Sequence, residues 1–345
     1  MKTKTFKYIY KQLGCLIILS STLMSCSDWT EVSPIEIKKQ TIEDSDPALY
    51  AKYLEDLKSY KESQHTIVIG RYDNSVKVPF NQSHLISKVP DSLDYLVLKS
   101  PDNLSTNEIS QLKDSQEKKG IKFLYDIDID AYFSNYQQFT VDEKNKKTLL
   151  NYLTEQVNLV NGLGQKYPYN GVVISFSGRD TLHMTVKEKE DEKAIQGLFN
   201  SVLNNWKTAN AGKELLYRGN PQSLIDKSVL SDVKYIILPT LNIISKEGLT
   251  FTLLNAIGNN ISEDKFIIES NSISYKPEEV DKKMGYFANG DVATQGATQW
   301  ILSRLSSDIQ VKGLSIENLQ YDYFNIIKSY QYSREAISSL NPSIK

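Results

Sequence analysis

The sequence predicts a single (β/α)8 barrel, and two features of the chain lead to this prediction. Eight short apolar segments recur along the chain, nearly all separated by segments with helical spacing of apolar residues. This alternation is typical of parallel strands whose sheet is covered by helices on both faces. The first apolar segment continues as IGRYDNS over residues 69–75, which does not fit the G-x-G-x-x-G loop of a dinucleotide-binding fold. We therefore favour a closed barrel over the alternative, a doubly wound open sheet.

The expected elements follow from these apolar patterns in chain order. A first helix is expected at residues 48–63, where Leu49, Tyr53, Leu57 and Tyr60 recur at helical spacing. Strands are expected at residues 65–72, 93–99, 121–128, 170–177, 213–219, 234–242, 265–272 and 311–319. Further helices are expected at residues 106–120, 145–165, 192–210, 220–230, 245–259, 294–305 and 334–340. Gly120 and Gly212 are expected to end two of these helices.

The N-terminus has the order of a secretory signal. Four lysines within residues 1–11 precede an apolar run at residues 13–23, which is too short to cross a membrane. The run ends in LMSC, which resembles a bacterial lipobox and implies acylation of Cys26. The alternative is an ordinary signal peptide with an incidental cysteine.

This organisation predicts three segments. They are a lipoprotein signal peptide at residues 1–25, a polar lipid-anchored tether at 26–47, and a barrel with a C-terminal helix at 48–345. We expect the protein to be held on the outer membrane, facing the cell surface.

The amino-acid composition limits the kinds of ligand and cofactor that we expect. The mature chain would keep Cys26 as its one cysteine, and the three histidines (His65, His84 and His183) lack metal-ligand spacing, so we expect no metal and no cofactor. A formal net charge of −2 gives no indication of a nucleic-acid partner. The 21 tyrosines suit a sugar ligand, because an aromatic ring packs on a pyranose face while its hydroxyl forms hydrogen bonds.

A barrel places its site at the C-terminal ends of the strands. The side chains expected there are polar or aromatic, with few acids, which suits a neutral, hydroxyl-rich ligand. The candidate glycan-binding residues are Tyr72, Asp73, Asp126, Ser177, Arg179, Tyr217, Arg218, Asn242, Glu269 and Tyr321. Tyr286 and Phe287, in a long segment at residues 275–296, are further aromatic candidates.

Asp126 and Asp128 lie two residues apart on one expected strand and so point to the same face. Two carboxylates there could share acid and base roles. We favour the alternative, in which they are polar ligands or salt-bridge partners of Arg71 or Arg218.

Residues 169–177, YNGVVISFS, resemble the fourth strand of glycoside hydrolase family 18, the chitinases and endo-β-N-acetylglucosaminidases. The family motif D-G-x-D-x-D-x-E falls on Asn170, Gly171, Val173, Ser175 and Ser177, and only the glycine matches. Residues 53–74 also resemble the first helix and strand of lipid-anchored bacterial members of that family.

This resemblance implies a barrel that has lost its catalyst. In the family mechanism the final Glu protonates the glycosidic oxygen, and the preceding Asp orients the N-acetyl group of the substrate. A serine hydroxyl at Ser177 is too weakly acidic for this role, and general acid catalysis typically contributes about 10²–10⁴-fold. We therefore expect no catalytic residue on this strand.

Three functions remain open. The favoured one is capture of N-acetylglucosamine-containing glycans, such as N-glycans, for an outer-membrane glycan transporter and neighbouring surface glycosidases of a polysaccharide-utilisation system. The second is an active endo-β-N-acetylglucosaminidase that uses Asp126, Asp128 or Glu269. The third is a structural partner of a surface complex that has no sugar site.

Overall fold

The computed structural model describes residues 42–139, 147–257, 261, 263–275, 278, 282–305 and 309–342. Contacts divide the chain into two units, residues 1–51 and 52–345. Helix α2 (Ile42–Ser45) lies in the first unit, and α3 (Pro47–Glu62) begins there. The predicted signal peptide and Cys26 lie outside the described residues. Within the described ranges, no helix is both long and apolar enough to cross a membrane.

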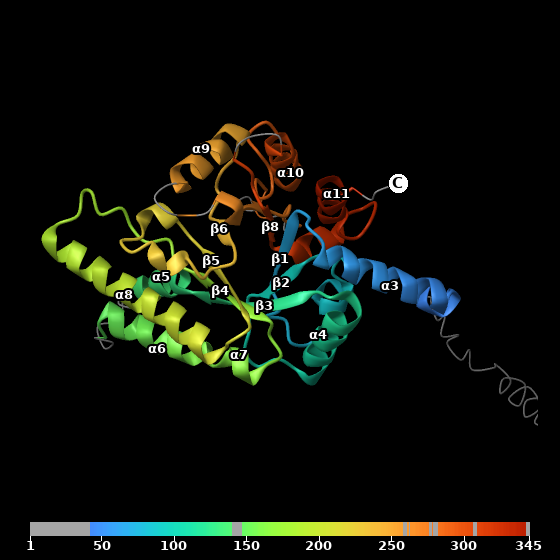
Figure 1. Cartoon of the computed structure of the whole chain (residues 1–345), viewed down its shortest axis with the longest axis horizontal. Coiled ribbons are helices and arrows are strands. Elements are labelled where there is room, and N and C mark those ends of the chain that lie inside the picture. Colours follow the sequence, from blue (N-terminus) through green and yellow to red (C-terminus); the bar gives the residue numbers. More distant parts are fainter. Residues whose placement is uncertain are drawn as a thin grey trace, which may run out of the picture. The chain divides into compact units, whose positions relative to one another are not determined.

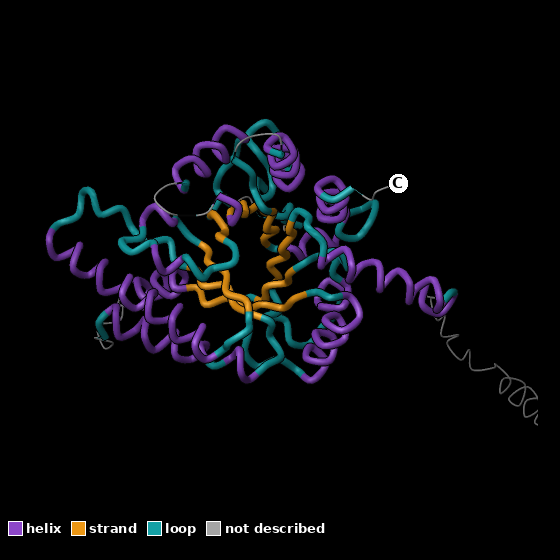
Figure 2. Tube along the Cα trace, in the orientation of Figure 1, coloured by secondary structure: helices purple, strands orange, loops and turns teal. Residues whose placement is uncertain are grey.

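The second unit contains a closed barrel of eight parallel strands, as predicted. Each strand pairs with the next along the chain, and the last pairs with the first. Figure 2 shows these strands as a ring with the helices outside it. The strands are β1 (Ile67–Tyr72), β2 (Tyr95–Leu98), β3 (Lys122–Asp128), β4 (Gly171–Ser175), β5 (Glu214–Arg218), β6 (Ile236–Leu238), β7 (Phe266–Asn271) and β8 (Gly313–Glu317).

Helices cover the outside of the barrel (Figure 1). The α-helices that follow α3 are α4 (Thr106–Lys119), α5 (Ile129–Phe139), α6 (Leu149–Asn161), α7 (Leu163–Lys166), α8 (Val186–Ala209), α9 (Lys246–Ala256), α10 (Ala293–Arg304) and α11 (Gln331–Leu340). Short 3₁₀ turns are η1 (Gln82–His84), η2 (Ile86–Lys88), η3 (Pro221–Ser223), η4 (Ser228–Leu230), η5 (Glu263–Lys265) and η6 (Leu319–Phe324).

The prediction of a helix at residues 220–230 is wrong. This stretch forms only η3 and η4, because Asp226 accepts hydrogen bonds from the backbone and side chain of Ser228 and holds a tight turn between them. Competition of this kind between a short polar side chain and the helical backbone favours turns. Ile225, an apolar residue that a helix here would be expected to bury against the barrel, is 58% exposed.

Helix ends follow local chemistry. Gly120 ends α4 in the left-handed region, at a φ of 67°, as predicted. Helix α8 instead ends at Ala209 with Asn210 as its cap, and Gly212 takes a φ of 82° two residues later. The same helix starts six residues before its expected position, because Thr185 and Glu188 form a capping box there.

Alternation along each strand separates two cores. On β3, Phe123, Tyr125 and Ile127 point outward into the layer between barrel and helices. Leu124 points inward, where it packs with inward residues of the other strands. Because side chains alternate, Asp126 and Asp128 share the inward direction of Leu124. The same parity decides which strand-end side chains face the mouth of the barrel.

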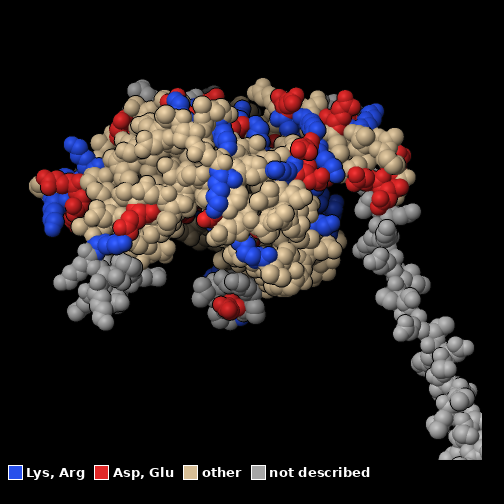
Figure 3. Space-filling model, turned by 90° about the horizontal axis from the view of Figure 1, so that it is seen from below, with Lys and Arg blue, Asp and Glu red and all other residues tan. Residues whose placement is uncertain are grey.

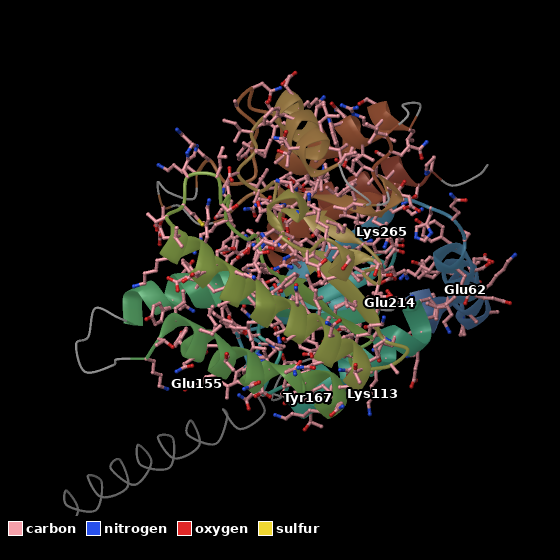
Figure 4. The ribbon with its side chains drawn as sticks, turned by 60° about the vertical axis from the view of Figure 1, so that its left-hand side comes forward. Glu62, Lys113, Glu155, Tyr167, Glu214 and Lys265 are labelled. Atoms are coloured by element: carbon pink, nitrogen blue, oxygen red, sulfur yellow. The ribbon has the colours of Figure 1, made fainter. Side chains whose placement is uncertain are left out.

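The opposite, N-terminal end of the barrel is closed by a polar cluster around Glu214, which is labelled in Figure 4. Its carboxylate accepts hydrogen bonds from the Tyr95 hydroxyl at 2.6 Å and from the ammonium groups of Lys122 and Lys234. Burial alone would raise the pKa of Glu214, but these partners lower it. The cluster stabilises the N-terminal end of the barrel, which in this fold is the end concerned with stability.

Charges of both signs share the surface. On the face shown in Figure 3, lysine and arginine side chains lie among aspartates and glutamates and form no single-sign field. A nucleic-acid partner would call for a cationic patch, which this face does not present.

Candidate glycan site at the mouth of the barrel

The C-terminal mouth of the barrel holds a network of ion pairs, which we call the mouth network. Each member lies in the C-terminal half of its strand or just after it, and the carboxylates come from three different strands. The members are Arg71, Lys99, Asp126, Arg218, Glu269 and Glu317.

Arg71 is the centre of the network. Its Nη2 donates to Asp126 Oδ2, and its Nε donates to Glu317 Oε2 at 2.6 Å. Lys99 Nζ donates to the other oxygen of Glu317 at 2.5 Å. Arg71, Asp126 and Glu317 are all buried. The predicted pairing of Arg71 with a β3 aspartate is therefore confirmed for Asp126.

A second pair closes the other side of the mouth. Arg218 donates from Nε and Nη2 to the two oxygens of Glu269, at 2.6 and 3.1 Å. Thr240, just after β6, accepts a hydrogen bond from the Glu269 backbone and donates one to its carbonyl, which fixes this part of β7. Arg218 thus takes Glu269 as its partner.

The ion pairs of the network shift the pKa values of its members. Burial alone would raise the pKa of Glu317, but Arg71 and Lys99 outweigh it and lower that pKa to about 2. Burial lowers the pKa of Arg71, whereas the carboxylates of Asp126 and Glu317 raise it by more. Burial raises the pKa of Glu269, against the opposing effect of Arg218. Arg71 and Glu317 therefore stay charged at neutral pH.

Asp128 differs from these acids. Its Oδ1 accepts a hydrogen bond from the Ala131 backbone at 2.8 Å, which caps α5. Within the described part of the chain, no cation lies within ion-pair distance of its carboxyl group. Burial, and then the charge on Asp126, raise the pKa of Asp128 from 3.8 to about 6. A carboxyl group with this pKa changes charge near pH 6.

Strand β4 brings no acid to the mouth. Val173 packs in the inner apolar core, and Ser175 Oγ donates to Asp126 Oδ1 at 2.9 Å. Ser177 follows the strand, and its Oγ donates to Asp130 Oδ2, in the first turn of α5, at 2.8 Å. Both oxygens of Asp130 also accept from the Ser177 backbone N–H. Of the positions that were matched to the family motif in the sequence, Val173 is thus apolar, and the hydroxyls of Ser175 and Ser177 are already bonded.

Two tyrosines chosen from the strand ends do not reach the mouth. Tyr72 and Tyr217 are fully buried in the outer core. Side chains alternate along a strand, and each tyrosine lies next to an inward-pointing arginine, so each points outward. The Tyr72 hydroxyl donates to the Ser83 carbonyl at 2.6 Å, and the Tyr217 hydroxyl donates to the Phe176 carbonyl at 2.8 Å. The expectation that they line the site is corrected: both hold loops against the barrel.

Three polar candidates lie around the mouth rather than in it. Arg179 is exposed, and its Nε donates to the buried Glu192 at 2.7 Å. Asp73 is half-buried, and its carboxylate accepts from the Ser75 backbone in a turn. Asn242 is exposed in the loop between β6 and α9.

An aromatic cluster stands on the loops that follow β7 and β8. Tyr321, half-buried, contacts Tyr275 edge-on with ring centroids 4.9 Å apart. Tyr275 also contacts Phe324, at 4.6 Å, and these two rings are 53% and 42% exposed. Tyr286 is also exposed, whereas Phe287 is buried in the outer core. We call Tyr275, Tyr321 and Phe324 the aromatic rim.

Sequence reasoning missed several of these groups. Glu317 lies at the end of β8, where the same strand-end rule could have found it as the partner of Arg71 and Lys99. Tyr275 and Phe324 lie in loops, where the strand pattern gives no signal. Among the described residues, no group of three or more His, Cys, Asp or Glu could hold a metal ion.

The chain matches one family of known proteins. The model of glycoside hydrolase family 18, BT1044-like, matches residues 30–339. The chain therefore belongs to glycoside hydrolase family 18, in its BT1044-like group. No match was found among curated proteins.

Solved structures share the fold at low sequence identity. A selenomethionine Glu-to-Gln variant of BT1044 is 19% identical, with a TM-score of 0.60, and the match covers 88% of this chain and 96% of that one. An endo-β-N-acetylglucosaminidase from Cordyceps militaris is 16% identical, with a TM-score of 0.58 and coverage of 84% and 96%. YKL-39, solved in the presence of chitooligosaccharides, is 10% identical, with a TM-score of 0.53 and coverage of 80% and 100%.

Proposed function

We propose that this protein is a pseudo-glycosidase that captures N-acetylglucosamine-containing glycans, such as N-glycans, and leaves them intact. Acylation of Cys26 would hold it on the outer membrane, facing the cell surface. There it would pass glycans to an outer-membrane transporter and neighbouring surface glycosidases.

The observation that supports binding without cleavage is the chemistry of β4. Val173 and Ser175 occupy its inward positions, and Ser177 lies two residues beyond its end. None of these three side chains can protonate a glycosidic oxygen at neutral pH. Three acids of the mouth do not replace them directly, because Asp126, Glu269 and Glu317 are each bonded to an arginine.

The observation that supports a sugar ligand is the pairing of polar groups with exposed rings. Tyr275 and Phe324 offer aromatic faces at one side of the mouth, and the mouth network offers donors and acceptors within it. Aromatic faces with a few placed hydrogen-bonding groups are typical of sugar sites. The choice of N-acetylglucosamine comes from the family and from the C. militaris enzyme, one structure of which is a complex with fucosyl-N-acetylglucosamine-Asn.

Calorimetric titration tests the binding. The soluble chain, starting after Cys26, is titrated with a defined N-glycan and, as the matched control, with a cello-oligosaccharide that lacks acetamido groups. We expect saturable binding of the N-glycan with a Kd between micromolar and millimolar, about −4 to −8 kcal/mol. Absence of saturable binding to any N-acetylglucosamine-containing glycan contradicts the proposal.

The anchor is tested separately. Wild-type protein is expected in the outer-membrane fraction and accessible to protease on intact cells, whereas Cys26→Ser is expected in the soluble fraction. Equal membrane association of the two proteins contradicts the anchor and leaves the binding proposal unaffected.

Asp128 favours a second candidate function, an endo-β-N-acetylglucosaminidase with a rearranged acid. A carboxyl group with a pKa of about 6 and no ion-pair partner within the described residues has the properties of a general acid. Cleavage of an N-glycan by the wild-type protein, abolished in Asp128→Asn, would establish this function in place of capture.

A further inference from the structure

Three inward side chains form a row at one level of the mouth. In the strand register, Asp128 on β3 pairs with Ser175 on β4, and Ser175 pairs with Arg218 on β5. Neighbouring strands lie about 4.7–4.9 Å apart, so the row is about two strand spacings wide. It therefore presents a carboxyl, a hydroxyl and a guanidinium group side by side.

Asp128 has the unused acceptor of this row. Its Oδ1 accepts from the Ala131 backbone, and its Oδ2 has no hydrogen-bond partner among the described residues. Asp126, one layer deeper, is bonded to both Arg71 and Ser175. The row therefore ends in a half-buried carboxyl group with one oxygen available to a ligand.

The unused donors belong to the two arginines. Arg218 binds Glu269 through Nε and Nη2, which leaves its Nη1 without a partner in the part of the chain that is described. Arg71 Nη1 is buried without a hydrogen-bond partner. Because an unpaired buried donor is costly, an acceptor beside Arg71 Nη1 would be favoured, and Arg218 Nη1 is available to a ligand.

We propose that Asp128 binds the glycan directly, accepting a hydrogen bond from a sugar O–H or N–H group, and makes capture dependent on pH. This inference rests on the proposed glycan binding. It assigns the ligand contact to an acid on β3 and not to the strand that carries the family motif.

The surrounding charges define the ligand. Asp128 and the mouth network together contain three cations against four acids, so the ionised mouth carries an excess negative charge. The site therefore favours neutral glycans that donate hydrogen bonds, and it disfavours acidic sugars.

The charged and titratable groups around Asp128 oppose one another. Asp126 on the same strand disfavours its ionisation, whereas Arg218 on β5 and Arg71 on β1 favour it. Tyr132, on α5, interacts electrostatically with it and stays protonated, because burial and then the two aspartates raise the pKa of Tyr132. With a pKa of about 6, Asp128 changes charge between pH 5 and 7.

The test is a titration of wild type and Asp128→Asn with chitotriose, three linked N-acetylglucosamine units, between pH 5 and pH 7.5. Asn keeps the oxygen that caps α5, so the variant is expected to fold. Losing a hydrogen bond to a charged acceptor should weaken binding about 10- to 100-fold at pH 7.5. Wild-type affinity should fall about tenfold from pH 7 to pH 5, and the variant should stay within about twofold.

The outcomes separate this inference from the function on which it rests. Wild-type binding that Asp128→Asn reproduces within about twofold at pH 7.5, or with the same pH dependence, overturns the role of Asp128 alone. No saturable wild-type binding at any pH overturns both proposals. Asp114→Asn, which removes an exposed acid on α4, is the matched control and should bind as wild type.

Discussion

Replacing Asp128 by Asn should make the protein more stable at neutral pH, although it weakens the proposed ligand contact. Burial and Asp126 raise the pKa of Asp128 from 3.8 to about 6, so ionising it in the folded protein is unfavourable. Two pKa units correspond to about 3 kcal/mol of the free energy of unfolding. Asn removes this cost and keeps the α5 cap, and sites that trade stability for binding in this way are common.

The raised pKa of Asp128 determines how the stability of the wild-type protein changes with pH. Between pH 4 and 6 the folded protein holds the Asp128 proton and the unfolded chain has lost it, so wild-type stability from this group falls as pH rises. The stability difference between Asp128→Asn and wild type should be near zero below pH 4 and reach about 2–3 kcal/mol above pH 7.

Urea unfolding followed by circular dichroism at several pH values measures this difference. Asp114→Asn is the control, because removing an exposed i,i+4 pair with Lys118 should change stability by no more than about 0.5 kcal/mol. A difference between Asp128→Asn and wild type that does not vary with pH, or a variant less stable than wild type at pH 7, would refute the reasoning.

Three further predictions concern stability. Arg71→Met should destabilise the protein by about 3–5 kcal/mol in urea unfolding, because Asp126 and Glu317 lose a buried cation, and a loss below about 1 kcal/mol would contradict the network. Tyr217→Ala should lower the free energy of unfolding by about 3–5 kcal/mol and Tyr217→Phe by about 1 kcal/mol. An Ala variant as stable as wild type would contradict the burial of Tyr217 in the outer core. Burial lowers the pKa of His65, but Asp94 and the Ser63 carbonyl raise it by more. The stability that protonated His65 contributes should therefore be fully present below pH 6.5 and should be lost as pH rises through the raised pKa. Unfolding of His65→Gln and wild type at pH 6 and pH 8 measures this, and an equal difference at both pH values would count against it.

Much of the fold could be predicted from the sequence, because barrel strands repeat a short buried pattern between helical segments. The helix expected at residues 220–230 failed because Asp226 and Ser228 form a local turn that competes with the helix. Helix α5 was missed because it follows β3 directly, and no polar loop separates the two.

The site was predictable only in part. Strand ends indicate the right level of the barrel, but parity decides the direction of each side chain. Tyr72 and Tyr217 were chosen for their chemistry, although Arg71 and Arg218 beside them have the inward parity. Parity along β3, in contrast, correctly placed Asp126 and Asp128 on one face.

Long-range partners were beyond sequence reasoning. Arg71 and Glu317 are 246 residues apart in sequence and meet only because β8 closes the barrel against β1. The pKa of Asp128 likewise depends on burial and on Asp126, together with arginines from two other strands. Neither the Arg71–Glu317 pair nor the pKa of Asp128 can be predicted from a single segment of the sequence.

Mass spectrometry of the bound glycan tests the central claim, capture without cleavage, most directly. The soluble chain is incubated at pH 6 with a stoichiometric amount of a defined N-glycan that retains both core N-acetylglucosamine units, and the ligand is recovered from the isolated complex. We predict that the glycan is retained and recovered at its full mass. Recovery of products cut between the two core units would contradict the account and establish an enzyme whose acid lies outside β4.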